Sequence, residues 1–389
     1  MSILFRGARK VDADGRVNDF WMSVTGTTIA ETGAGTPPDD VVDGASEHVD
    51  VGGDWLVPGF IDLHGHGGGG FSYDDGRDAI QRGLATHRAH GTTRNLVSLV
   101  ANPLAELHTS LDLIADLTAD DPLILGSHLE GPFLSLHRRG GHNSVFLRHP
   151  STADIQALVD ASRSTLRMVT LAPELPGGLA AIEQFAAAGV TVGIGHTDAD
   201  FALAREAFAR GARVLTHTFN AMPGIHHRQP GPVVAAFEDP RILLELILDG
   251  HHVHPDVATM TFHSAPGRVA LVTDSMAAAG STDGDYRLGS LNVAVRGGVA
   301  LLRGTTTIAG STLTQDQALR VAMDGARITI PQAIEALTVV PARALGLQHR
   351  HGMLAPGFAA DAVLLSENWE VREVWADGRR VSAGVHAGT

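Results

Sequence analysis

The chain has 389 residues and no cysteine, which excludes disulfides, thiolate nucleophiles and cysteine-ligated zinc sites. Its formal net charge of -14 makes nucleic acid and anionic membranes unexpected partners, and an anionic substrate would need a local basic pocket. Lys10 is the single lysine, so a Walker A lysine or a carboxylated bridging lysine in the body of the chain is excluded.

Both ends of the chain are predicted to be β-rich. Residues 1–50 contain short strand patterns with turns, and the last 40 or so residues include a strand pair with a turn at Asp377–Gly378. We predict a small β-sandwich domain formed by residues 1–55 and 346–389. No apolar run reaches the roughly 20 residues of a membrane span, and the N-terminal residues lack a signal-peptide core. We therefore expect a cytoplasmic protein.

The middle of the chain, residues 56–345, alternates short apolar runs with amphipathic stretches. Near-continuous apolar runs separated by helices are typical of a parallel sheet covered on both faces. Eight runs predict an α/β fold, a TIM-type (β/α)8 barrel, with an inserted hairpin near residues 281–308. The predicted strands are 56–64, 92–100, 123–130, 166–174, 190–197, 212–219, 242–250 and 268–274. The clearest helical stretches are 78–91, 151–164, 177–189 and 199–211.

Histidines and carboxylates gather at the carboxyl ends of these runs, where barrel enzymes place their chemistry. A lone histidine or acid there is more often structural, and a polar rim without a metal stays an alternative. The conjunction favours a divalent-metal site with nitrogen and oxygen ligands. The residues at these ends are His64, His66, His128, Glu130, His196, His217, Asp249 and Asp274.

Several motifs resemble the amidohydrolase superfamily, and within it the N-acetylglucosamine-6-phosphate deacetylases. The resemblance covers essentially the whole chain. The motifs are PGFIDLHGHG at 58–67, HLEGPF at 128–133, GGHN at 140–143, GIGHTDAD at 193–200, THTFNAMP at 216–223 and LVTDSMAAAG at 271–280.

The resemblance implies a metal centre with one or two divalent ions per subunit, zinc first, with iron, manganese or cobalt as alternatives. Glu130, His196 and His217 would form the first position. His64 and His66 would form a second, with Glu130 bridging and Asp274 nearby as the acid–base residue.

The same resemblance implies the substrate contacts. His142 would contact the acetyl carbonyl, and Ala309 and Gly310 would lie near the acetyl pocket. Asn220, Ala221 and Arg228 would contact the phosphate. His252 would contact it from a neighbouring subunit, which implies a homodimer. His226, His227, His251 and His254 have no assigned role, and the glycines after His66 are expected to let the loop pass close to the sugar.

The implied reaction is hydrolysis of N-acetyl-D-glucosamine 6-phosphate to D-glucosamine 6-phosphate and acetate, in amino-sugar catabolism or cell-wall sugar recycling. N-acetylgalactosamine-6-phosphate deacetylase, and more distantly a purine deaminase, are alternative enzymes. A non-catalytic relative that keeps the barrel as a scaffold is an alternative of another class, although such a protein would be expected to have lost ligands.

Overall fold

The computed structural model describes residues 2–383, so the last six residues of the predicted β domain, 384–389, lie outside the described part. The chain divides into two compact units. Their boundaries are not those of the two predicted domains, which remain a prediction. The first unit comprises Met1–Asp62, His87–Arg94 and Gln315–Thr389, and the second comprises Leu63–Thr86 and Asn95–Thr314.

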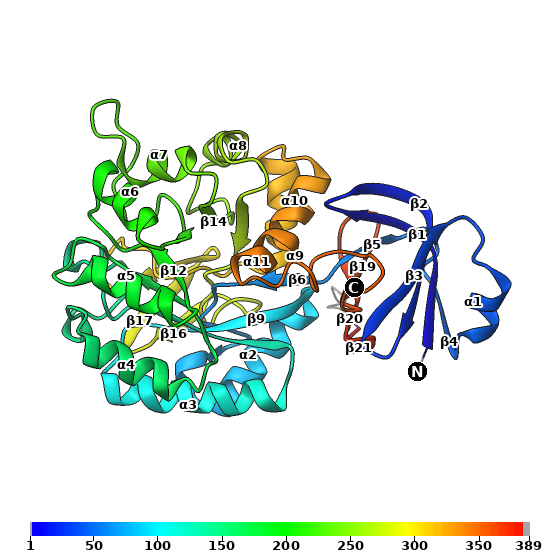
Figure 1. The fold of residues 1–389 in the computed structure, drawn as a ribbon, viewed down its shortest axis with the longest axis horizontal. Coiled ribbons are helices and arrows are strands. Elements are labelled where there is room, and N and C mark those ends of the chain that lie inside the picture. The colour runs from blue at the N-terminus through cyan, green and yellow to red at the C-terminus, as the bar shows by residue number, and fades with distance from the viewer. Residues whose placement is uncertain (1, 384–389) are drawn as a thin grey trace. The chain divides into compact units, whose positions relative to one another are not determined.

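Strands from both ends of the chain share one sheet in the first unit (Figure 1). β5 pairs in parallel with β1 and antiparallel with β19, so N-terminal and C-terminal strands are neighbours. The order is β21-β20-β19-β5-β1-β2-β3, and β4 pairs with β1. The strands are β1 Ser2–Asp12, β2 Gly15–Thr25, β3 Thr28–Ala34, β4 Glu47–Asp50, β5 Trp55–Pro58, β19 Ala362–Leu365, β20 Val371–Ala376 and β21 Arg379–Ser382, and a short helix α1 spans Asp39–Gly44.

The second sheet is the predicted barrel. Its eight strands follow chain order, from β6 to β15, and are parallel. A bridge between Gly65 and Ser275, beside a hydrogen bond from the Asp274 amide to the His64 carbonyl, brings the ends of the first and eighth strands together. The strands are β6 Phe60–Asp62, β9 Thr92–Leu99, β10 Ile124–Glu130, β11 Leu166–Leu171, β12 Thr191–Ile194, β13 Val214–Leu215, β14 Leu243–Ile247 and β15 Val269–Val272.

Helices follow the barrel strands, and the four predicted from the sequence are confirmed. Side-chain caps start two of them, because Ser151 and Asp200 accept hydrogen bonds from Asp154 and Leu203 amides. None of the helices within residues 2–383 combines the length and apolar character that crossing a membrane needs. The helices are α2 Arg77–Ala89, α3 Leu104–Asp120, α4 Thr152–Ala161, α5 Gly178–Ala187, α6 Phe201–Ala209, α7 Gly231–Glu238, α8 Pro255–Ser264, α9 Gln315–Arg320, α10 Ile330–Leu337 and α11 Val339–Ala344.

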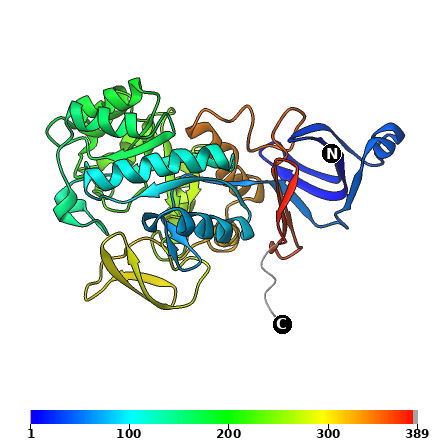
Figure 2. The ribbon, with the colours of Figure 1, turned by 90° about the horizontal axis from the view of Figure 1, so that it is seen from below.

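The insertion after the eighth strand lies where it was predicted, but it has three strands and not the two of a hairpin. It forms a three-stranded antiparallel sheet, seen in yellow in Figure 2, with β16 Gly284–Leu288, β17 Leu291–Arg296 and β18 Val299–Leu302. Its third strand follows a Gly297–Gly298 turn in which both residues have positive φ. Apolar side chains of this sheet, including Leu288, pack against Val100 and Met276.

Candidate active site

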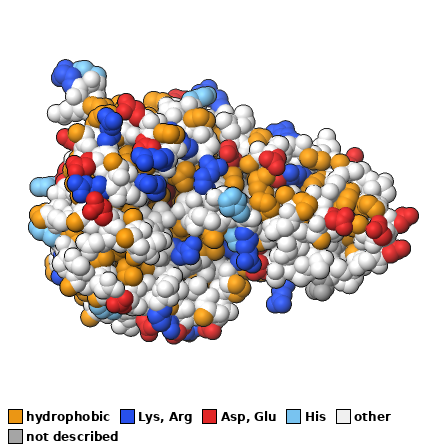
Figure 3. Space-filling model, in the orientation of Figure 1, with side chains coloured by type: hydrophobic (Ala, Val, Ile, Leu, Met, Phe, Trp, Pro, Cys, Tyr) orange, Lys and Arg blue, Asp and Glu red, His pale blue; other side chains and the backbone are white. Residues whose placement is uncertain are grey.

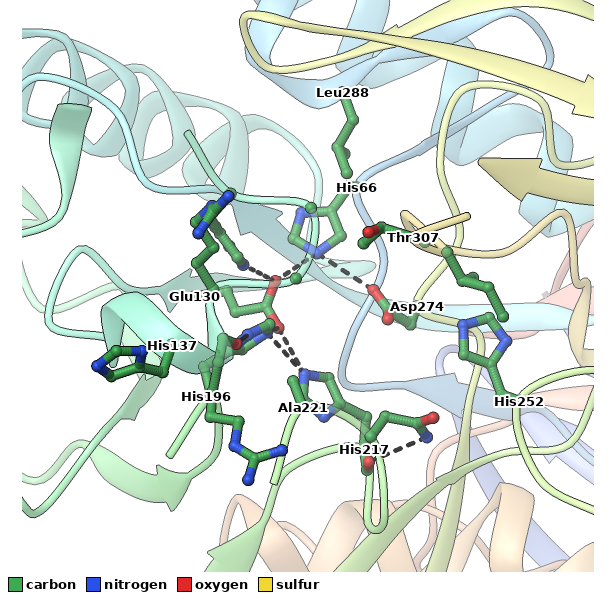
Figure 4. Close-up of a pocket in the computed structure, with 18 residues that line it drawn as sticks. His66, Glu130, His137, His196, His217, Ala221, His252, Asp274, Leu288 and Thr307 are labelled. Carbon is green, nitrogen blue, oxygen red and sulfur yellow. Dashed lines mark hydrogen bonds and ion pairs between the residues drawn. The ribbon is translucent and has the colours of Figure 1, made fainter. Parts of the chain in front are cut away.

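The structure brings six of the eight predicted strand-end residues together at one end of the barrel (Figure 4). These six are His64, His66, Glu130, His196, His217 and Asp274. The other two lie outside the cluster, because His128 contacts Thr170 and Asp249 contacts His252. The six clustered residues are almost fully buried, with exposed fractions between 0% for His64 and 9% for Asp274. His64 and His66 both follow β6, and the other side chains come from four further strands or from the residues just after them. The parallel arrangement therefore does what the sequence predicted, because it places successive carboxyl ends at the same edge.

Glu130, the last residue of β10, lies at the centre of this cluster. Its Oε1 atom is 3.1 Å from His196 Nε2 and 3.0 Å from His217 Nε2. Its Oε2 atom is 3.1 Å from His66 Nε2, and Oε1 is 3.3 Å from His64 Nε2. One carboxylate thus faces both pairs of histidines, the arrangement needed for a bridging ligand.

The spacing of these atoms fits a metal ion. His196 Nε2 and His217 Nε2 are 2.9 Å apart, and His64 Nε2 and His66 Nε2 are 3.2 Å apart. A tetrahedral ion about 2.0–2.1 Å from each ligand separates its ligands by roughly 3.3 Å. Imidazole and carboxylate donors suit Zn, Fe, Mn or Co. The donor set and its compactness therefore fit the metal that the sequence implied.

Attraction between the carboxylates and the histidines of the cluster sets the pKa values of these groups. Burial acts to raise the pKa of Glu130, but His64, His142 and His196 hold it well below its usual value. Burial also acts to raise the pKa of Asp274, but His64 and His66 lower it to about 2. Conversely, burial acts to lower the pKa of His66, yet hydrogen bonds to Asp274 and Glu130 raise it to about 9. Ionised carboxylates therefore face these rings and attract cations.

The backbone at the strand ends adopts the left-handed region at three of these side chains. The φ angles are 47° at His196, 28° at His217 and 44° at Asp274. Non-glycine residues there cost about 1–3 kcal/mol each and persist only where the surroundings hold them. Asp274 is held by hydrogen bonds from its amide to the His64 carbonyl and from the Ser311 amide to its carbonyl, both 2.7 Å.

His142 joins the cluster from the loop after β10. Its Nε2 atom lies 3.1 Å from Glu130 Oε2, and its Nδ1 atom accepts a hydrogen bond of 3.2 Å from the Ala101 amide. Burial lowers the pKa of His142 to about 4, so the ring is neutral at pH 7. Because Nδ1 accepts, the proton is on Nε2, which faces Glu130 Oε2 in this structure.

A cavity of about 470 Å³ opens above the cluster, within the usual range for small-molecule sites. Its lining includes the predicted residues Asn220, Ala221 and Gly310. It also includes residues that the sequence did not single out, notably Arg138 and Arg139 at the rim and Leu288, Thr307 and Ile308 on the side of the inserted sheet. Ala309 is 1% exposed and packs behind the lining. No residue of Gly67–Gly70 is among the described residues that line the cavity.

The structure places two of the predicted phosphate contacts differently. His252 lines the cavity of its own chain. Burial acts to lower its pKa, but Asp249, 2.7 Å away at Nδ1, raises it. Arg228 is exposed and outside the cavity lining. Its loop projects before α7 in Figure 1, and Figure 3 shows basic and histidine side chains at the tip.

The four unassigned histidines lie away from the cluster. His226 and His227 are exposed on the same projecting loop as Arg228. His251 is also exposed, and the His254 side chain caps α8 by accepting a hydrogen bond from the Asp256 amide.

The sequence reasoning missed Glu245. This residue lies in the middle of β14, is 0% exposed, and contacts His64 Nδ1 through Oε2 at 3.2 Å. Its only sequence signal is an acid inside the apolar run LLELI.

Residues 55–381 match the amidohydrolase family. The chain belongs to the amidohydrolase family. It is 39% identical over 332 residues to N-acetylgalactosamine-6-phosphate deacetylase of Escherichia coli O157:H7, a match covering 84% of this chain and 88% of that protein. It is 35% identical over 351 residues to N-acetylglucosamine-6-phosphate deacetylase of Danio rerio, covering 87% of both chains.

Solved structures of amidohydrolases extend the likeness to the fold. A mutant of N-acetyl-D-glucosamine-6-phosphate deacetylase from Mycobacterium smegmatis, in complex with N-acetyl-D-glucosamine-6-phosphate, is 40% identical with a TM-score of 0.92. The match covers 98% of this chain and 99% of that one. The predicted barrel with its β-rich ends is therefore confirmed as the amidohydrolase fold.

Proposed function

We propose that the protein hydrolyses the N-acetyl group of N-acetyl-D-glucosamine 6-phosphate to give D-glucosamine 6-phosphate and acetate, in amino-sugar catabolism or cell-wall sugar recycling. The observation that carries the proposal is Glu130 between two pairs of histidines, beside Asp274, at the floor of the cavity. The relatives named for this deacetylation support it.

The metal centre is proposed to hold one or two divalent ions per subunit, zinc first, with iron, manganese or cobalt as alternatives. Glu130, His196 and His217 would hold one ion, and His64 and His66 the second, with Glu130 shared. A divalent ion held here would supply an activated water and a Lewis acid for the amide carbonyl.

Asp274 is the proposed general base and acid. Its carboxylate is ionised at neutral pH, because neighbouring histidines lower its pKa to about 2 against the effect of burial. It would accept a proton from the attacking water as the oxygen bonds to the acetyl carbon. It would then deliver that proton to the sugar nitrogen as the carbon–nitrogen bond breaks.

His142 is proposed to bind the acetyl carbonyl oxygen. Its neutral ring carries the proton on Nε2, as the Ala101 hydrogen bond to Nδ1 requires. This N–H would stabilise the negative charge that develops on the oxygen. Gly310 would border the acetyl group, where a Cβ atom would lie 3.1 Å from the Asp274 carbonyl and from Met276 Cβ.

The phosphate would bind on the opposite side, near Asn220, Ala221 and His252. The raised pKa of His252 favours the cationic ring that an anion needs. Arg228 lies outside this chain's cavity, so we propose that it reaches the cavity of a second copy in a homodimer. In this proposal His252 contacts the phosphate in its own chain and Arg228 contacts it in the second copy, whereas the sequence prediction placed His252 in the neighbouring subunit. We propose that the reaction takes place in the cytoplasm, because the charged phosphate group keeps sugar phosphates from crossing the membrane.

The galactosamine epimer is the second candidate substrate, because one relative at 39% identity is named for it. The test is acetate release by the purified protein from both N-acetylated sugar 6-phosphates. A kcat/KM at least tenfold higher on the glucosamine compound supports the proposal. The reverse preference selects the alternative, and no release from either rejects a deacetylase of these sugars.

A further inference from the structure

Glu245 is a buried acid that contacts His64 of the proposed metal-binding cluster. It lies in β14 between apolar neighbours and has no exposed surface. Burying a carboxylate costs several kcal/mol unless strong partners compensate. Such a residue in a barrel strand therefore needs a specific reason.

Its two partners belong to different metal positions. Oε2 lies 3.2 Å from His64 Nδ1 and also accepts a hydrogen bond of 3.2 Å from the His217 backbone amide. Oε1 has no hydrogen-bond partner among the described residues. A single oxygen atom thus contacts one histidine of each proposed position.

The contact with His64 decides how that ring is used. A carboxylate accepts and does not donate, so the proton of the neutral ring lies on Nδ1. The lone pair is then on Nε2, which faces Glu130 at 3.3 Å and Asp274 at 3.5 Å. A carboxylate on the far nitrogen of a metal-binding histidine also raises its basicity as a ligand.

The other histidines lack this support. His196 Nδ1 lies 2.7 Å from the neutral carbonyl of Arg138. His66 Nδ1 and His217 Nδ1 have no hydrogen-bond partner among the described residues. Among the cluster's histidines, His64 is therefore the one whose ring contacts a carboxylate through Nδ1. Glu245 also accepts a hydrogen bond from the backbone amide of His217, which stabilises the left-handed conformation of that residue.

We infer that Glu245 is a positioning residue that strengthens metal binding at the His64–His66 position through His64 Nδ1, and steadies the other position through the His217 backbone. This inference rests on the proposed metal centre. It does not depend on which sugar phosphate is the substrate.

Two substitutions separate the negative charge of Glu245 from its two hydrogen bonds. In Glu245→Gln the amide oxygen can take the place of Oε2 and keep both hydrogen bonds, while the negative charge is lost. In Glu245→Leu both bonds are lost, in a strand that already contains leucines. Glu335→Gln, on α10, is the matched control, since Glu335 is no part of the cluster.

The experiment measures zinc binding to the metal-stripped protein by competition with a chromophoric chelator, together with stoichiometry and the melting temperature. The wild type and Glu335→Gln are expected to bind two zinc ions. Glu245→Gln should weaken one of them by about tenfold to a hundredfold, the usual effect of losing such a partner. Glu245→Leu should weaken both.

The His64→Ala variant tests whether Glu245 acts on metal binding through the His64 ring. That variant should retain one zinc ion, and adding Glu245→Gln should leave its affinity unchanged, because the ring through which Glu245 acts is gone. Unchanged affinities in Glu245→Gln, equal weakening of both ions, or a further loss in the His64→Ala background would each overturn the inference. Two zinc ions bound by a wild type that releases no acetate would reject the proposed function and leave this inference standing.

Discussion

Asp274→Asn separates the proton-transfer role from the fold. The side chain keeps its shape, and asparagine tolerates the left-handed φ of 44° better than most residues. The hydrogen bond from the residue 274 amide to the His64 carbonyl also remains possible. We therefore expect a folded protein that keeps the metal on Glu130, His196 and His217.

The expected loss of activity follows from what the carboxylate does. An ionised base of low pKa becomes an amide that cannot accept a proton from water. Positioned general acids and bases contribute typically 10²–10⁴-fold, so kcat should fall by at least about a hundredfold. At about 1.4 kcal/mol per tenfold, this is roughly 3–5 kcal/mol of barrier.

The assay is acetate release at saturating N-acetyl-D-glucosamine 6-phosphate, with bound metal and melting temperature measured on the same samples. A variant with normal melting and at least one metal ion, but activity within tenfold of wild type, would refute the role of Asp274. Loss of all bound metal would instead contradict the assignment of the first position to the other three residues.

Three further predictions concern the second metal position, the phosphate contact and the first unit. Replacing His64 and His66 together by alanine should remove one metal ion and leave the other, by elemental analysis; loss of both or of neither contradicts the division. Arg228→Ala should raise KM for the phosphorylated substrate by about tenfold to a hundredfold and leave kcat nearly unchanged, because it removes one charged hydrogen bond to the phosphate. An unchanged KM would contradict the contact. Arg94→Met should lower the free energy of unfolding by about 3–5 kcal/mol, because it removes the cation that donates hydrogen bonds of 2.8 and 2.9 Å to the buried carboxylate of Asp361. A loss of less than about 1 kcal/mol in chemical unfolding would contradict this.

The buried pair also sets a pH dependence. Burial acts to raise the pKa of Asp361, but His351 and Arg94 lower it below its usual value. A depressed pKa stabilises the fold above the unfolded value of about 3.9, and this stabilisation is lost as the pH falls below it. Acid titration of the wild type should therefore lose stability below about pH 4, and Arg94→Met should lose less there. Arg241→Met, which breaks the ion pair between the exposed Arg241 and Asp239, is the control and should change the stability far less than Arg94→Met.

The positions of the metal-site residues were predictable because one geometric rule covers them. Parallel barrel strands end at the same edge, so polar residues that close successive apolar runs must converge there. His66, Glu130 and Asp274 needed no knowledge of loop structure. Glu245 was not predictable in this way, since its partner His64 is 181 residues distant and an isolated acid inside an apolar run has no periodic signal.

Loop conformation accounts for what the sequence could not supply. Arg228 follows Asn220 closely in the chain, but the segment between them turns away from the cavity. The left-handed backbone of His196 and His217 has no marker in residue type. The glycines after His66 allow close packing, because a Cβ at Gly67 would meet the Phe71 carbonyl and one at Gly69 would meet the Thr86 side chain.

The most direct test of the central claim is acetate release by the metal-stripped protein before and after zinc is restored. The substrates are N-acetyl-D-glucosamine 6-phosphate and the same sugar without phosphate. We predict negligible activity without metal, recovery with zinc, and a kcat/KM at least a hundredfold higher for the phosphorylated sugar. Full activity in the stripped protein, or equal activity on both sugars, would contradict the account.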